Sequence, residues 1–264
     1  MKTPPPRLIR PFPEWDGRVR AFFSTRRGGF SQGPYADLNL GFRCGDDPVE
    51  VNSNWALALT AEGLDGRTLV LPRMIHGDTL TDADAFAAEL EAAGVSEEAM
   101  VRLEPEGADA VFSRSRKRVL AVTMADCLTA LIFDPERSTV AAVHAGWRGT
   151  RSRILGKTLE AMAASGAINA GSTMVAFGPC LRPESLEVGA EVASQLPPEF
   201  IRKDGAKSYF DMPACNRAQA LQAGIPPGNL RDMGGDTLRE TETCFSFRRD
   251  GAASGRMAAV IALI

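Results

Sequence analysis

Blocks of apolar and polar residues alternate along the chain and predict strands and helices in mixed order. Apolar runs of strand length lie at 19–24, 69–75, 118–123, 129–133, 139–143, 172–177 and 257–264. Helical spacing of apolar residues occurs at 48–62, 82–93, 153–164, 187–196 and 212–223. Strands that alternate with helices in this way indicate an α/β fold.

The amino-terminal segment differs from the rest, because prolines and charges dominate residues 4–13. This composition favours extended chain, and we expect residues 1–18 to form an extended arm. No internal repeat, low-complexity run or long linker divides residues 19–264. We therefore expect one compact domain there, in which residues 98–107 form a polar connection.

Charge and cysteine content narrow the class of protein. The chain has 30 Lys and Arg against 33 Asp and Glu, a formal net charge of −3, which gives no overall field to gather nucleic acid or anionic lipid. No stretch has the length of a signal peptide core or a transmembrane helix, so we expect a cytoplasmic protein without nucleic-acid or membrane partners. Five cysteines, an odd number without close spacing, favour reduced thiols. A monomer is slightly favoured over an oligomer.

Histidine is scarce, since the chain has only 2, and each lies in a compact motif beside glycine or alanine. His76 follows a predicted strand, His144 ends another, and Cys127 lies between two more. Imidazole and thiolate are ligands of tight zinc sites, and catalytic sites generally use three protein ligands and leave the fourth position open. We therefore expect these three residues to bind zinc.

Several polar residues near these motifs allow two interpretations each. Asp126 is suited to orient a ligand histidine through its second ring nitrogen, or to cap a strand end. Trp147 is suited to stack on a flat ligand or to pack in a turn. Arg26 in a glycine-rich loop, Arg148 and Arg248 are suited to bind an anion or to brace their own segments.

In order along the chain, these motifs resemble the YfiH-like purine nucleoside phosphorylase family, the laccase-domain family once described as polyphenol oxidases. The matching segments are Phe23-Ser24-Thr25-Arg26, Gly33-Pro34-Tyr35, Leu38-Asn39-Leu40-Gly41, Ile75-His76-Gly77, Ala125-Asp126-Cys127, His144 to Thr150, Gly178-Pro179-Cys180, Glu187-Val188-Gly189 and Phe245 to Gly251. They span nearly the whole chain, and the His-Ala-Gly-Trp-Arg-Gly run is highly specific.

The resemblance implies an α/β/α sandwich of mixed sheets, distantly similar to cysteine hydrolases. It implies phosphorolysis of adenosine, inosine, guanosine and S-methyl-5′-thioadenosine, with adenosine deamination as a second activity. The zinc ligands of the family match His76, Cys127 and His144. We expect zinc as the cofactor, with copper possible as an adventitious metal. We expect these ligands and Asp126 to be catalytic, and purine nucleosides and phosphate to be the partners. The expected substrate-binding residues are Ser24, Arg26, Asn39, Arg148 and Arg248.

The chain departs from the family pattern at several positions, none of them a metal ligand. Met74 stands where the family commonly has glutamine, Thr129 where it has proline, and Leu186 where it has tyrosine. Asp236 takes the place of a frequent cysteine, and Cys244 that of an aromatic residue. We expect these departures to affect substrate preference and to leave metal binding intact.

Two other enzyme classes and a binding module are alternatives. Cys127 as nucleophile and His144 as base form the pair of a cysteine hydrolase or amidase, which leaves His76 without a role. A copper-dependent polyphenol oxidase agrees with the older family label, but two histidines are too few for a multicopper cluster. The last alternative is a non-catalytic binding module that retains the pocket. The intact set of metal-ligand residues argues against it.

Overall fold

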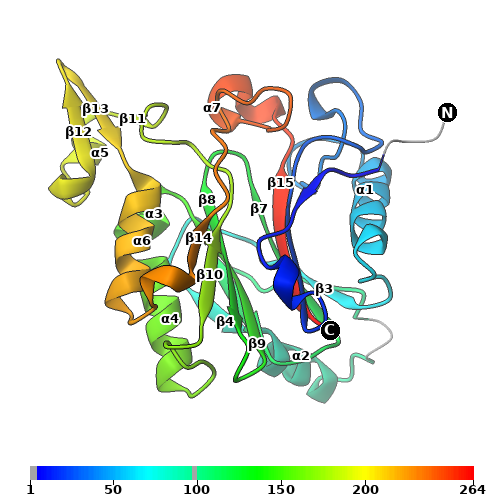
Figure 1. The fold of residues 1–264 in the computed structure, drawn as a ribbon. Coiled ribbons are helices and arrows are strands. Elements are labelled where there is room, and N and C mark those ends of the chain that lie inside the picture. The colour runs from blue at the N-terminus through cyan, green and yellow to red at the C-terminus, as the bar shows by residue number, and fades with distance from the viewer. Residues whose placement is uncertain (1–4, 97–99) are drawn as a thin grey trace.

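In the computed structural model, which describes residues 5–96 and 100–264, two six-stranded sheets pack face to face between helices (Figure 1). The strand order of the first sheet is β1 (Leu8–Ile9), β2 (Val19–Ser24), β15 (Met257–Leu263), β7 (Arg118–Met124), β3 (Thr68–Val70), β5 (Arg102–Leu103). That of the second is β14 (Leu230–Asp232), β10 (Met174–Phe177), β8 (Leu128–Asp134), β9 (Thr139–Ala145), β6 (Ala110–Ser113), β4 (Leu80–Asp82). A small third sheet has the order β11 (Glu187–Val188), β13 (Lys207–Phe210), β12 (Ile201–Asp204). The predicted α/β/α sandwich of mixed sheets is confirmed.

Helices cover the outer face of each large sheet (Figure 1). Helix α1 (Pro48–Ala61) packs on the first sheet, and α4 (Ile154–Ala164) and α6 (Met212–Gln222) pack on the second. The other α-helices of the described residues are α2 (Ala83–Ala92), α3 (Trp147–Arg151), α5 (Ala190–Ala193) and α7 (Phe247–Asp250). None of the helices in the described part of the chain is long and apolar enough to cross a bilayer.

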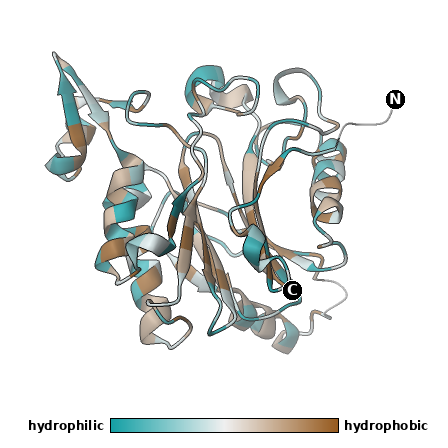
Figure 2. Cartoon of the chain, viewed as in Figure 1, coloured by the Kyte–Doolittle hydropathy of each residue, from teal (hydrophilic) through white to brown (hydrophobic). Residues whose placement is uncertain are grey.

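Strand β7 illustrates how the core is built. Leu120 and Val122 pack between the two large sheets with Leu131 of β8, whereas Val119 points the other way, into the cluster that holds Trp55 of α1. Both faces of the central strands are buried, so their sequences are nearly continuous apolar runs. Figure 2 shows this concentration of hydrophobic residues on the strands at the centre of the molecule. That continuity is why most of these strands were predictable.

The predicted helix starts are confirmed where an acidic side chain caps the helix. Asp47 accepts the backbone N–H of Val49 at the start of α1. Asp82 does the same for Asp84 and Ala85 at the start of α2. These bonds satisfy N–H groups that have no partner within the helix.

Two predicted elements are wrong in part. The strand predicted at 69–75 ends at Val70, because Pro72 has no N–H to donate to a ladder. Leu71 and Arg73 still donate backbone N–H groups to Leu103 and Pro105. The helix predicted at 187–196 begins instead as strand β11, which pairs with β13, and only Ala190–Ala193 is helical. Gly189 separates the two elements at the helix N-cap.

Other short elements were not predicted. The β12–β13 hairpin turns at Gly205 and Ala206, and Gly205 has φ +58°, so a glycine turn signal was present in the sequence. The connection predicted at 98–107 contains β5, and its residues 98 and 99 lie outside the described part of the chain. In the arm, β1 pairs with β2 and Phe12 packs against Phe133, with ring centroids 6.3 Å apart. The described part of the arm thus lies against the sandwich, and the division at residue 18 stays a prediction.

Candidate metal centre

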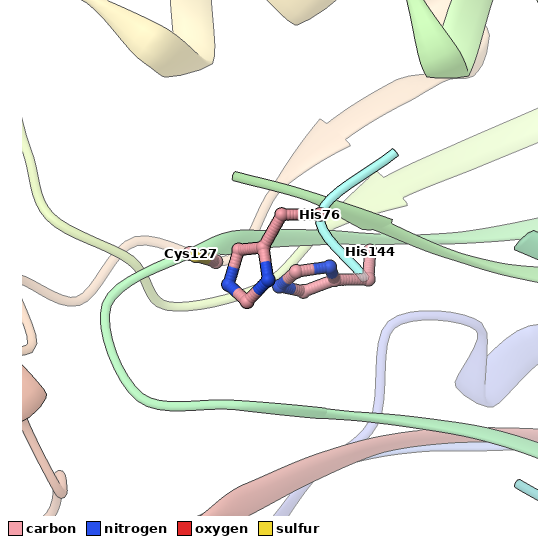
Figure 3. Close-up of side chains that lie close together, drawn as sticks. All are labelled: His76, Cys127 and His144. Atoms are coloured by element: carbon pink, nitrogen blue, oxygen red, sulfur yellow. The ribbon is translucent and has the colours of Figure 1, made fainter. Parts of the chain in front are cut away.

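Two strand ends and a loop bring the predicted zinc ligands together. Strands β8 and β9 are antiparallel, with Thr129 opposite His144, so Cys127 at the entrance to β8 lies beside the end of β9. His76 reaches the same place from the segment that links β3 to β4. The ligand atoms of His76, Cys127 and His144 all lie within 4.8 Å of one another. Figure 3 shows the two imidazole rings side by side with Cys127 next to them.

A buried carboxylate, that of Asp109, holds two of these ligands in place. Its Oδ1 lies 2.9 Å from Nδ1 of His144, and the side chain is fully buried. The same carboxylate accepts the backbone N–H groups of Ile75, His76 and Gly77 at 3.1, 3.0 and 2.7 Å. These bonds fix the loop in which His76 has a left-handed φ of +62°. Asp109 therefore orients one ligand through its ring and the other through its backbone.

This arrangement corrects the expectation that Asp126 orients a ligand histidine. The carboxylate of Asp126 instead accepts the hydroxyl of Thr237 at 2.7 Å and the backbone N–H of Arg248 at 2.6 Å. Asp109 was missed because no motif around it pointed to the metal. The signal available was a carboxylate placed directly before the buried strand Ala110–Ser113, where an unpaired charge is costly.

Charges within the cluster favour the form of cysteine that binds metals. Burial opposes ionisation of Cys127, but His144 and His76 outweigh it and lower the pKa of the thiol to about 6. Burial likewise disfavours charge on His144, but Cys127 and Asp109 raise the pKa of the imidazole to about 9. Without a metal, the pair is thus a thiolate and an imidazolium near neutral pH.

Gly146 leaves the space that the cluster occupies. A Cβ at this position would lie 2.8 Å from Sγ of Cys127 and 3.3 Å from Cδ2 of His76. The two imidazole rings are nearly perpendicular, at 87°, with centroids 4.9 Å apart. Two imidazoles, one thiolate, a carboxylate behind one imidazole and a glycine cradle fit a zinc ion with an open position.

The cluster opens into a cavity of about 640 Å³, a volume suited to a nucleoside-sized ligand. Its polar lining beyond the three ligands consists of Thr123, Asp126, Arg248 and Arg256. Its apolar lining consists of Met74, Met124, Ala125, Trp147, Leu181, Leu186, Met212 and Phe247. The cavity therefore combines apolar walls with two guanidinium groups and one carboxylate.

The family described as Multi-copper polyphenol oxidoreductase laccase matches residues 20–264. The chain belongs to this laccase-domain family. The purine nucleoside phosphorylase YfiH of Escherichia coli (strain K12) is 34% identical over 267 residues, 97% of this chain and 98% of the relative. The adenosine deaminase RL5 of an unknown prokaryotic organism is 32% identical over 247 residues, 90% and 91% of the two chains.

A solved structure has the same fold. The hypothetical protein YfiH of Bacillus licheniformis superposes with a TM-score of 0.86 at 24% identity, over 98% of this chain and 99% of the other. Two enzyme names, one for a purine nucleoside phosphorylase and one for an adenosine deaminase, thus occur among relatives that match this chain over most of their length.

Of the five expected substrate-binding residues, only Arg248 lines the cavity of this laccase-domain chain. Ser24 is fully buried, and its hydroxyl accepts the backbone N–H of Ala258. Arg26 is a brace, because its Nε and Nη2 both donate to the carbonyl of Ala36. Arg148 is exposed, with its guanidinium carbon 4.4 Å from the centroid of the Trp147 ring.

Asn39 is also fully buried and outside the cavity lining. Its Oδ1 accepts the backbone N–H of Arg256 at 2.7 Å. It therefore supports a residue that does line the cavity, and Arg256 itself was missed, because it lies beyond the motif at 245–251. Among the family departures, Met74 and Leu186 line the cavity, whereas Thr129, Asp236 and Cys244 do not.

Proposed function

We propose that this chain is a zinc-dependent purine nucleoside phosphorylase of the cytoplasm. Its proposed substrates are phosphate and adenosine, inosine, guanosine or S-methyl-5′-thioadenosine, and its proposed side activity is adenosine deamination. The observation that carries the proposal is one cavity that holds a His-Cys-His cluster and the guanidinium groups of Arg248 and Arg256. The names of the curated relatives support the same reactions.

The small number of histidines favours zinc over copper as the metal of this site. His76, Cys127 and His144 are ligands that both metals accept. The chain has only 2 histidines, fewer than a multicopper cluster requires, so we treat the oxidase label of the family as describing adventitious copper. Metal analysis of protein purified without added metal tests this assignment, and stoichiometric copper with dioxygen-dependent phenol oxidation would contradict it.

In phosphorolysis, an oxygen of phosphate forms a bond to C1′ of the ribose while the bond from C1′ to the purine nitrogen breaks. The purine departs with the electron pair and takes up a proton, and the products are ribose 1-phosphate and free base. When bound, zinc supplies a Lewis acid that polarises oxygen. Arg248 and Arg256 hold the anion, while Phe247 and Met74 contribute apolar wall against the nucleoside and exclude water.

In deamination, water adds to the purine carbon that carries the amino group, and ammonia leaves. This reaction needs a group that moves protons between the water and the departing nitrogen. We assign that role to Asp126, because it is the carboxylate among the described residues that line the cavity. The same side chain holds the backbone of Arg248, so it links the two proposed activities.

The decisive experiment incubates the purified protein with adenosine, with and without phosphate, and identifies the products. Adenine and ribose 1-phosphate that appear only with phosphate support phosphorolysis, and inosine supports deamination. The variant Cys127→Ala loses a ligand of the proposed site, so zinc and both activities disappear together. Full phosphorolysis by a metal-free Cys127→Ala protein would overturn the mechanism.

A cysteine hydrolase is the second candidate, and one observation favours it. Cys127, His144 and Asp109 form a nucleophile, a base and a carboxylate that orients the base, the arrangement of a cysteine hydrolase. His76 has no role in that mechanism. Hydrolysis of a model amide by zinc-stripped protein, abolished by iodoacetamide, would favour this candidate over the phosphorylase.

A further inference from the structure

Among the described residues, no carboxylate pairs with the guanidinium groups of the two arginines that line the cavity. Neither Arg248 nor Arg256 forms an ion pair within residues 5–96 and 100–264, whereas other arginines do, such as Arg182 with Asp232 at 2.7 Å. Two guanidinium groups against the one carboxylate of Asp126 in the lining attract an anion to this cavity, although the chain as a whole has a net charge of −3.

Each guanidinium is held at one end by backbone carbonyls. Nη1 of Arg248 donates to the carbonyl of Glu187 at 2.8 Å, and Nη1 of Arg256 donates to those of Ser254 and Gly255 at 2.6 and 3.0 Å. Nε and Nη2 of both side chains have no acceptor among the described residues. The Nε and Nη2 edge is the fork that binds two oxygens of a phosphate side by side.

The backbones of the two arginines are fixed in the same way. Oδ2 of Asp126 accepts the N–H of Arg248 at 2.6 Å, and Oδ1 of Asn39 accepts the N–H of Arg256 at 2.7 Å. Both acceptor side chains are buried. Gly41 leaves room for the Arg256 side chain, because a Cβ there would lie 2.6 Å from its Cγ. Forks that are positioned before the ligand arrives lose less entropy on binding.

The arginine at position 26 provides a contrast. Its Nε and Nη2 donate to the carbonyl of Ala36 and its Nη1 donates to that of Thr241. All three nitrogens are thus engaged by the protein. Arg26 therefore has no free edge for a ligand, and it does not line the cavity.

We propose that Arg248 and Arg256 form the phosphate-binding subsite of the metal cavity, with Asp126 and Asn39 as residues that position them. This inference rests on the proposed phosphorolysis for its ligand, which is inorganic phosphate. Arg256 is the member of the pair that no sequence motif indicated, and it is therefore the residue to test.

The test compares zinc-loaded wild-type protein with Arg256→Gln, Arg256→Lys and a control, Arg137→Gln, in the exposed turn that joins β8 to β9. Calorimetry measures the Kd for inorganic phosphate, and steady-state kinetics measures KM for phosphate and for inosine. We expect Arg256→Gln to raise Kd and KM for phosphate at least about tenfold, with KM for inosine changed less than about twofold. Arg256→Lys keeps the charge without the fork, so it falls between wild type and Arg256→Gln. The control keeps wild-type values.

Unchanged phosphate Kd in Arg256→Gln that retains its zinc and its circular dichroism spectrum would overturn the subsite. If Arg256→Gln does not fold, Arg256→Lys decides, and a wild-type phosphate Kd in that variant overturns the bidentate role. The phosphate subsite and the proposed phosphorylase activity can be contradicted independently of each other. Wild-type protein that binds phosphate through Arg256 and does not cleave inosine keeps the subsite and loses the phosphorylase. Phosphorolysis by Arg256→Gln with a wild-type KM for phosphate supports the phosphorylase and overturns the subsite.

Discussion

Oδ1 of Asp109 lies 2.9 Å from Nδ1 of His144, and the same carboxylate accepts three backbone N–H groups from the loop that carries His76. One buried side chain thus positions two candidate metal ligands that come from different parts of the chain. The geometry of the cluster depends on this contact as much as on the ligands themselves.

We predict that Asp109→Asn weakens zinc binding by about 10- to 100-fold, because the neutral amide no longer raises the basicity of the His144 imidazole. Competition against a chromogenic chelator measures the change. The control is Asp204→Asn, at an exposed position in the β12–β13 hairpin, which keeps wild-type affinity. Equal zinc affinity in Asp109→Asn and wild type would show that the carboxylate is only structural.

Gly146→Ala is predicted to expel the metal. The added Cβ would lie 2.8 Å from Sγ of Cys127, so the thiol or the backbone has to move. Overpacking of this kind costs about 1–3 kcal/mol of folding stability. Zinc content by atomic absorption and denaturant unfolding measure both effects. Gly17→Ala is the matched control, since nothing lies within 4 Å of its Cβ. A fully metallated Gly146→Ala protein would contradict the prediction.

The zinc-stripped protein is predicted to react with iodoacetamide at Cys127 along a pH profile with a midpoint near 6. The pKa of this thiol is lowered to about 6, so the reactive thiolate is present above that pH and is lost as the pH falls through it. Burial raises the pKa of Cys180, Cys215 and Cys244, which keeps them unreactive at neutral pH. Mass spectrometry locates the modified residue. A midpoint near pH 9 would contradict the lowered pKa of the Cys127 thiol.

Met74→Gln is predicted to change substrate preference without changing zinc content. Met74 lines the cavity, and an amide in place of its thioether makes that wall polar. We expect kcat/KM for S-methyl-5′-thioadenosine to fall about tenfold relative to that for adenosine, the scale of discrimination in an apolar pocket. Leu221→Gln on the outside of α6 serves as the control. An unchanged ratio of the two substrates would place the methylthio group away from this wall.

The clustering of His76, Cys127 and His144 was predictable because the chain has only 2 histidines and both lie in compact motifs at predicted strand ends. The residues that support them were not. Asp109 acts through a pairing of β6 with β9 that no local pattern encodes. Arg256 reaches the cavity through a contact with Asn39, far from it in sequence. The motif match also suggested that Ser24 binds substrate, but Ser24 is part of the core. A motif residue does not reveal whether its side chain contacts the ligand or the rest of the protein.

The strands of the fold also differ in how far their own sequences predict them. Strands buried on both faces, such as β8, were visible as apolar runs. Strands of two or three residues, such as β5 and β14, depend on neighbours supplied by the rest of the sheet. Their sequences carry too few positions for a period of two to be recognised.

The antiparallel pairing of β8 with β9, which sets Thr129 opposite His144, has a consequence for tolerated length changes. Successive side chains of a strand point to opposite faces, so a slip of one residue turns His144 away from Cys127. A single deletion within either buried strand therefore abolishes the metal centre, even at a position remote from it. A deletion or insertion in the exposed turn at 135–138 leaves the pairing and the ligands where they are.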